Sequence, residues 1–178
     1  GKPVAGIRTA SHGFALRGTT PPPEGHAVWP EFDAEVLGGN YHNHHGNGPQ
    51  VKLTVAEGAA DHPILRGVDP SAFVSFGSLY LNAPLQKNAK PLLIGTIPDK
   101  PSEPVAWTHT SPAGGRVFYT SLGQIKDFEQ PDFRRFLANG LRWAAGLKAA
   151  REESASKGRR DGGGRERIMG KCVPPAMG

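Results

Sequence analysis

Residues 114–146, GGRVFYTSLGQIKDFEQPDFRRFLANGLRWAAG, form the stretch that decides the fold. Residues 116–122 are a short apolar run typical of a strand, and Gly114-Gly115 favours a hairpin connection to an earlier strand. Pro131 is suited to the first position of a helix, and Gly146 is placed to end it. The stretch therefore combines a strand with the clearest helix of the chain.

The helix over residues 131–146 is predicted by its apolar periodicity. One stripe is apolar or small, with positions Phe133, Phe136, Leu137, Gly140, Leu141 and Ala144. The opposite face is polar and is expected to meet water, with Arg134, Arg135, Asn139 and Arg142. Asp132 in the first turn suits the positive end of the helix dipole.

Further strands are predicted at residues 4–7, 51–55, 92–96 and 105–108, because these runs are apolar or alternate between apolar and polar residues. Residues 29–37 have helical spacing behind Pro30, and Gly38-Gly39 is expected to stop that helix. Residues 73–81 are compatible with a strand or with irregular structure.

The 178 residues carry a net charge of +5, and most of it lies at one end. Residues 1–147 hold 13 Lys/Arg and 12 Asp/Glu, whereas residues 148–178 hold 8 and 4. This basic, Gly- and Ser-rich tail is predicted to be disordered. We expect no specific nucleic-acid recognition, because no aromatic residues interleave with the basic ones to stack on bases.

Cys172 is the only cysteine of the sequence, which excludes an intrachain disulfide and a cysteine zinc site. No run approaches the roughly 18 apolar residues of a membrane span, so a soluble chain is predicted. Localisation stays open, since any export signal would precede residue 1.

Residues 37–48, LGGNYHNHHGNG, concentrate three of the seven histidines, His42, His44 and His45. Imidazoles bind metals, transfer protons and hydrogen-bond sugar hydroxyls near neutral pH. Flanking glycines favour a loop, where reactive groups are often placed. The same composition is also typical of an ordinary solvated loop, and the spacing does not decide between the two.

Taken together, GKPVAGIRTASHGF, LGGNYHNHHG, DHPILRGV, PVAWTHT, GGRVFYTSLGQ and FLANGLRWAAG resemble the ThuA-like (trehalose utilisation) family over residues 1–147. The resemblance implies an α/β fold, a flavodoxin-like three-layer sandwich related to class I glutamine amidotransferases. Ligands of such folds bind at the carboxyl ends of the strands. Compared with the family, the first βα units are expected to be missing, as in an N-terminally truncated member.

The family's active-site pattern is altered at three places. Arg8 occupies the turn where the amidotransferase relatives carry their nucleophile, which argues against glutaminase chemistry. Gln124 stands where the family usually has a histidine, and an amide cannot transfer a proton as an imidazole does. Gly77-Ser78 replaces an acidic pair.

The resemblance implies a crevice with His12 and His44 as catalytic residues. A divalent metal such as zinc, held by the same two histidines, is a further option. Predicted substrate-binding residues are Arg8, Ser11, Asn40, Tyr80, His109 and Gln124. An aromatic ring, Tyr80 or Trp107, is expected to stack on a pyranose face.

The leading hypothesis is a carbohydrate-utilisation protein that acts on trehalose or related glucosides, with a small carbohydrate as its partner. The alternatives are a sugar-binding module without turnover and an inactive fragment. A homo-oligomer is compatible with the sequence.

Overall fold

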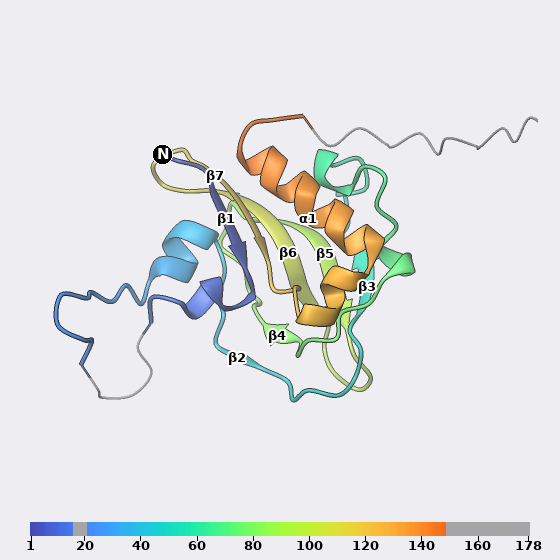
Figure 1. Cartoon of the computed structure of the whole chain (residues 1–178), viewed down its shortest axis with the longest axis horizontal. Coiled ribbons are helices and arrows are strands. Elements are labelled where there is room, and N and C mark those ends of the chain that lie inside the picture. Colours follow the sequence, from blue (N-terminus) through green and yellow to red (C-terminus); the bar gives the residue numbers. More distant parts are fainter. Residues whose placement is uncertain (16–20, 149–178) are drawn as a thin grey trace, which may run out of the picture.

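A five-stranded sheet forms the centre of the computed structural model, which describes residues 1–15 and 21–148 (Figure 1). Its strands follow the order β1 (Val4–Ile7), β7 (Arg116–Thr120), β6 (Glu103–Thr110), β5 (Lys90–Thr96) and β3 (Lys52–Val55). Only β1 and β7 pair in parallel; the other three pairs are antiparallel. The predicted strands are confirmed, and the mixed sheet with its helices gives the chain α/β character.

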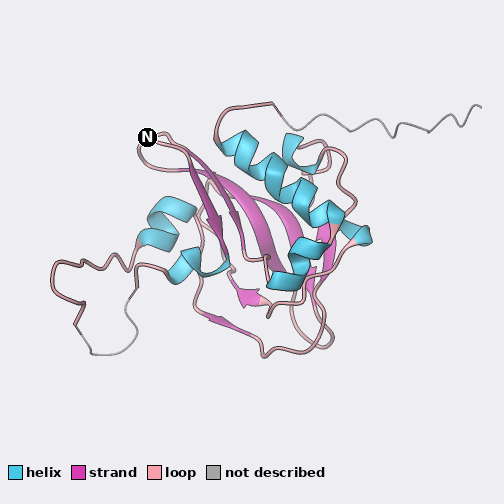
Figure 2. Ribbon diagram, in the orientation of Figure 1, coloured by secondary structure: helices cyan, strands magenta, loops and turns pink. Residues whose placement is uncertain are grey.

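A second, two-stranded sheet lies beside the first (Figure 2). It pairs β2 (Asn43–His44) with β4 (Tyr80–Leu81) in antiparallel orientation. The rest of residues 73–81 is not strand apart from a single bridge, in which Ser75 pairs with Val51. This bridge ties the segment to the sheet edge at β3.

Successive side chains of β7 point to opposite faces of the large sheet, and a helix packs against each face. On one face, Phe118 packs edge-on against Phe136 of α1 (Pro131–Ala144), with ring centroids 5.5 Å apart. On the other face, Tyr119 packs with Leu37 of the short helix η2 (Asp33–Leu37) and with Trp107.

Besides η2, four short connections are helical turns: η1 (Arg8–His12), η3 (Pro63–Leu65), η4 (Pro70–Ala72) and η5 (Ile125–Glu129). The helix predicted at 29–37 is thus shorter than expected. It ends where predicted, since Gly38 adopts a left-handed backbone conformation with φ 75°.

Two residues of α1 differ in burial from the prediction. Asn139 was assigned to the solvent face, which is wrong: it is 1% exposed and donates hydrogen bonds to the carbonyls of Ile64 and Arg66. Leu141 was assigned to the buried stripe and is 45% exposed. A buried amide that is fully hydrogen-bonded can replace an apolar residue, and periodicity alone does not reveal it.

The basic tail predicted at 148–178 lies outside the described residues from position 149 onward, and Cys172 lies there too. Within the described ranges, no helix has both the length and the apolar character needed to cross a membrane.

Candidate functional site

The parallel pairing of β1 with β7 brings two turns together. Ile7 pairs with Thr120, so the residues that follow each strand meet at the same edge. Arg8, which has a positive φ of 45°, donates from Nη1 to the carbonyl of Ser121 at 3.3 Å. Its own carbonyl accepts a hydrogen bond from the Tyr119 hydroxyl at 2.7 Å. The unusual backbone of Arg8 is thus held by the neighbouring strand.

The small sheet supplies the second half of the site. His44 and Tyr80 are direct partners in the β2–β4 register. The Tyr80 ring is only 4% exposed and lies beneath the Arg8 guanidinium, whose carbon is 5.2 Å from the ring centroid. Residues 36 positions apart in the chain therefore become neighbours at the site, with the ring centroids of His44 and Tyr80 5.9 Å apart.

Tyr41 joins the two halves. His12 stacks on it with ring centroids 4.5 Å apart, and its hydroxyl lies 3.0 Å from His44 Nδ1. Its ring is also 4.7 Å from that of Tyr80. We call Arg8, His12, Tyr41, His44 and Tyr80 the His12–His44 cluster; it unites both residues predicted to be catalytic.

Tyr41 itself was not among the predicted site residues. It stands three positions before His44 in the histidine-rich loop, and this spacing was the available signal.

A hydrogen-bond chain orients His12. The Ser11 hydroxyl donates to the Arg8 carbonyl at 3.2 Å and contacts His12 Nδ1 at 3.1 Å. A serine hydroxyl has one hydrogen, so while that hydrogen lies on the Arg8 carbonyl, His12 Nδ1 is the donor in the second contact. This arrangement favours the His12 tautomer with its proton on Nδ1.

Asp127 holds together the two segments that lie next to Arg8, residues 75–76 and the turn after β7. It was not among the predicted site residues. Its fully buried carboxylate accepts hydrogen bonds from the Ser75 hydroxyl and from the backbone N–H groups of Phe76, Gly123 and Gln124, at 2.7–3.1 Å. The available signal was the spacing Gln124-x-x-Asp127, which forms a capping box at η5.

Gly77 is required by the position of Arg8. A Cβ atom at this position would collide with the Arg8 guanidinium. The glycine thus leaves the space that the Arg8 side chain occupies in the turn after β1.

Asp33 is buried beneath the loop that carries Tyr41. Its Oδ2 accepts a hydrogen bond from the Tyr41 N–H at 2.6 Å, and a Cβ on Gly39 would lie 2.5 Å from its Oδ1. Among the described residues, Oδ1 has no partner. Burial raises the pKa of Asp33 to about 6, although the bond from Tyr41 opposes the shift.

The other predicted binding residues have separate contacts. Asn40 donates to the carbonyl of Ala83 at 3.3 Å, and the Gln124 side chain accepts from Lys126 N at 2.7 Å as the N-cap of η5. His109 is not brought to the cluster: it pairs with Val117, three residues along β7 from Thr120. Trp107 is fully buried and donates to the Leu37 carbonyl.

No group of three or more His, Cys, Asp or Glu within the described ranges is placed to hold a metal ion. Catalytic zinc sites commonly have three protein ligands, and the cluster supplies two imidazoles. The metal site at His12 and His44 stays a prediction.

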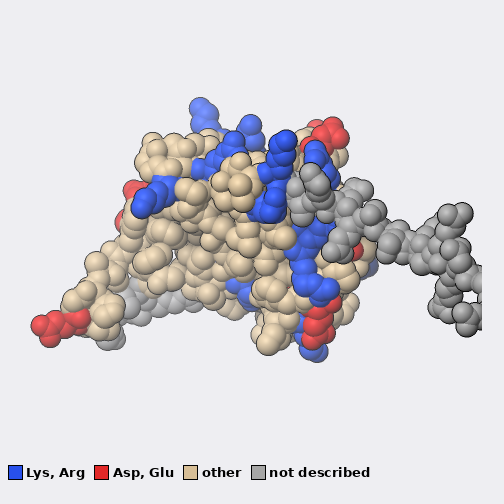
Figure 3. Space-filling model, turned by 45° about the horizontal axis from the view of Figure 1, so that its top comes forward, with Lys and Arg blue, Asp and Glu red and all other residues tan. Residues whose placement is uncertain are grey.

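Positive charge gathers at another place. Arg66, Arg116 and Lys148 line a cavity of about 530 Å³ beside Trp143, and the Arg116 guanidinium lies 5.3 Å from the Trp143 ring centroid. Figure 3 presents a face on which lysine and arginine side chains predominate over acidic ones.

We expect Asp33 to make the free energy of unfolding depend on pH. Its pKa in the folded protein, about 6, exceeds the ordinary 3.8, so between these values the folded state holds a proton that the unfolded chain has released. Stability from this group is therefore highest near pH 4 and falls as the pH rises to 6, by about 2–3 kcal/mol.

The Asp33→Asn variant keeps an acceptor for Tyr41 and carries no charge, so it removes this dependence. Urea unfolding of both proteins at several pH values measures the difference, because titrations that both share cancel. An equal pH dependence in the two proteins would contradict the assignment.

The sequence model of one protein family, ThuA, described as trehalose utilisation, matches residues 24–144. The matched segment contains Tyr41, His44 and Tyr80, whereas Arg8 and His12 precede it. A comparison with curated proteins finds no match. Since the family match covers more than half of the chain, the protein belongs to the ThuA, or trehalose utilisation, family.

Proposed function

We propose that the chain binds trehalose or a related neutral glucoside at the His12–His44 cluster and transfers protons at the sugar's hydroxyl groups. The observation that carries this proposal is the shared contact with Tyr41: His12 stacks on its ring, and His44 Nδ1 lies 3.0 Å from its hydroxyl. Two imidazoles, one from η1 and one from β2, thereby contact the same tyrosine. Membership of the ThuA family supports a sugar as the ligand.

The hydrogen bonds give the two imidazoles complementary roles. His12 donates from Nδ1 to Ser11, so its Nε2 carries the lone pair of a general base. As the imidazolium, His44 donates from Nδ1 to the Tyr41 hydroxyl oxygen, and its Nε2 carries the proton that it gives up as the acid. One ring then accepts a proton from a sugar hydroxyl while the other donates one.

In this proposal, the side chains of Arg8 and Asn40 recognise the sugar. Arg8 is half-buried and offers guanidinium N–H groups, and Asn40 offers an amide, both suited to hydroxyl oxygens. Tyr80 is 4% exposed, which favours a role as the backing for Arg8 and Tyr41 over stacking on a pyranose. No step passes through a metal, because His12 and His44 alone do not complete a ligand set.

Replacing either histidine with alanine should weaken trehalose binding at least tenfold and abolish turnover, because each ring contributes both a hydrogen bond and a proton-transfer group. Residue-resolved NMR titration with trehalose measures binding. His42→Ala is the matched control, since His42 lies in the same loop, is exposed, and bonds through its ring only to the nearby Asn40 carbonyl in the recorded contacts.

Wild-type affinity in both His12→Ala and His44→Ala, with folding verified by cooperative thermal unfolding, would rule out this site. Absence of cooperative unfolding in the wild-type chain would instead favour the inactive-fragment alternative.

A binding module without turnover is the second candidate, and Gln124 favours it. Its side chain caps η5 and has no titratable group. Gln124→His tests this idea, since a histidine can also cap a helical turn, as His62 does for η3 by accepting from Ile64 N. New turnover in the variant at unchanged trehalose affinity is the result expected for a binding module; turnover already present in the wild type excludes it.

We also propose that the fold is a flavodoxin-like three-layer sandwich, as in class I glutamine amidotransferases. Helices on both faces of the sheet support it. A glutaminase activity is not proposed, because Arg8 follows β1 where those relatives carry their nucleophile.

A further inference from the structure

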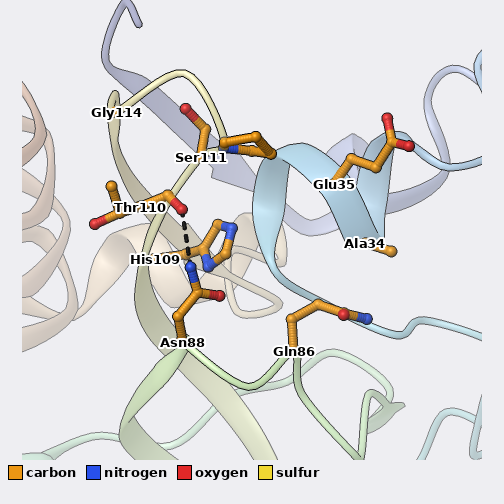
Figure 4. A pocket seen from close by; sticks show the side chains of 9 residues that line it. Ala34, Glu35, Gln86, Asn88, His109, Thr110, Ser111 and Gly114 are labelled. Atoms are coloured by element: carbon orange, nitrogen blue, oxygen red, sulfur yellow. Dashed lines mark hydrogen bonds between the residues drawn. The ribbon is translucent and has the colours of Figure 1, made fainter.

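A second cavity lies between η2 and the hairpin that connects β6 and β7. It measures about 510 Å³, which is within the range of small-ligand sites. Its polar lining comes from three separate segments and comprises Glu35, Gln86, Asn88, His109, Thr110 and Ser111. Figure 4 shows the His109 ring in the middle of these side chains, with Ser111 on one side and Asn88 and Gln86 on the other.

His109 has an unmet hydrogen-bonding capacity at this position. The residue is 5% exposed, and among the described residues its Nδ1 has no partner. The Glu35 backbone raises the pKa of His109 as a polar partner, and since Nδ1 has none, this contact falls to Nε2. Burial lowers the pKa of His109, which favours the neutral ring, so the wall of the cavity carries no positive charge.

The chemistry of the lining defines the class of ligand. Amides and hydroxyls both donate and accept hydrogen bonds, as sugar hydroxyls do. None of the described residues that line the cavity is lysine or arginine, and Glu35 is a carboxylate, so an anion finds no counter-charge there. Gln86 and Asn88 are exposed and their recorded bonds are long, 3.4 Å to the Gly39 carbonyl and 3.2 Å to the Thr110 carbonyl, so both can turn toward a ligand.

We propose that this cavity, the His109 pocket, is a second binding site, which takes a small neutral sugar or polyol through hydrogen bonds with the Asn88 and Gln86 side chains, with the His109 ring in its wall. It is separate from the His12–His44 cluster: His109 and Thr120 are three residues apart in the sheet register, or about 10 Å along the strand. The proposal does not rest on catalysis at the cluster.

NMR titration of the full ¹⁵N-labelled chain with glucose tests the proposal. The His109 ring nitrogens and the Asn88 side-chain amide should shift together along one saturating curve. Asn88→Leu should weaken this binding at least tenfold, whereas Lys87→Leu, an exposed neighbour that does not line the pocket, should leave it unchanged. Glucose 6-phosphate should bind at least tenfold more weakly than glucose.

Unmoved His109 and Asn88 signals at about 100 mM glucose would overturn the proposal, as would equal affinity in Asn88→Leu. Equal or tighter binding of glucose 6-phosphate would overturn the assignment to a neutral ligand. The ring signals of His12 and His44 report the other site in the same spectra, so failure of one site is distinguished from failure of the other.

Discussion

The carboxylate of Asp127 is the contact on which the arrangement of the site depends. It accepts hydrogen bonds from residues 75–76 and from the turn after β7, and thereby holds these two segments together. Gly77, next in the first segment, leaves the space that the Arg8 guanidinium occupies, and Arg8 in turn lies over Tyr80. A buried carboxylate is costly unless hydrogen bonds compensate for the lost water, and Asp127 has four of them.

Two other buried carboxylates near the site also accept hydrogen bonds from backbone N–H groups of loops. Glu103 accepts from the N–H groups of Asn82 and Ala83 after β4, and Asp33 accepts from that of Tyr41. Each of these buried carboxylates fixes a loop that is too irregular to be held by strand pairing. Asp33 has the weakest compensation, with one oxygen lacking a partner among the described residues, and it is the one whose pKa rises to about 6. The loops around the His12–His44 cluster are therefore held in place by hydrogen bonds to buried carboxylates.

Local patterns predicted the strands and the helix that begins at Pro131, because periodicity and the Gly and Pro boundaries act over a few residues. They did not predict the antiparallel pairing of most of the sheet, which depends on contacts between distant segments. The sequence also identified Arg8, Ser11, His12 and His44, which the structure brings together. Tyr41, Asp127 and Asn139 were missed because their roles arise from burial against residues far away in the chain. The position of His109, three residues along the sheet from Thr120, depends on strand pairing in the same way.

Asp127→Asn tests the dependence of the site on this buried carboxylate most directly. The amide replaces an acceptor with a donor opposite the donors of Ser75, Gly123 and Gln124, so amide hydrogen exchange at Phe76, Gly123 and Gln124 should accelerate at least tenfold. Trehalose binding should be lost, while the amides of β5 and β6 stay protected. Asp132→Asn is the matched control, since this half-buried carboxylate lies outside the site and accepts from Asp69 N at 2.9 Å. Wild-type exchange and wild-type trehalose affinity in Asp127→Asn would contradict the account.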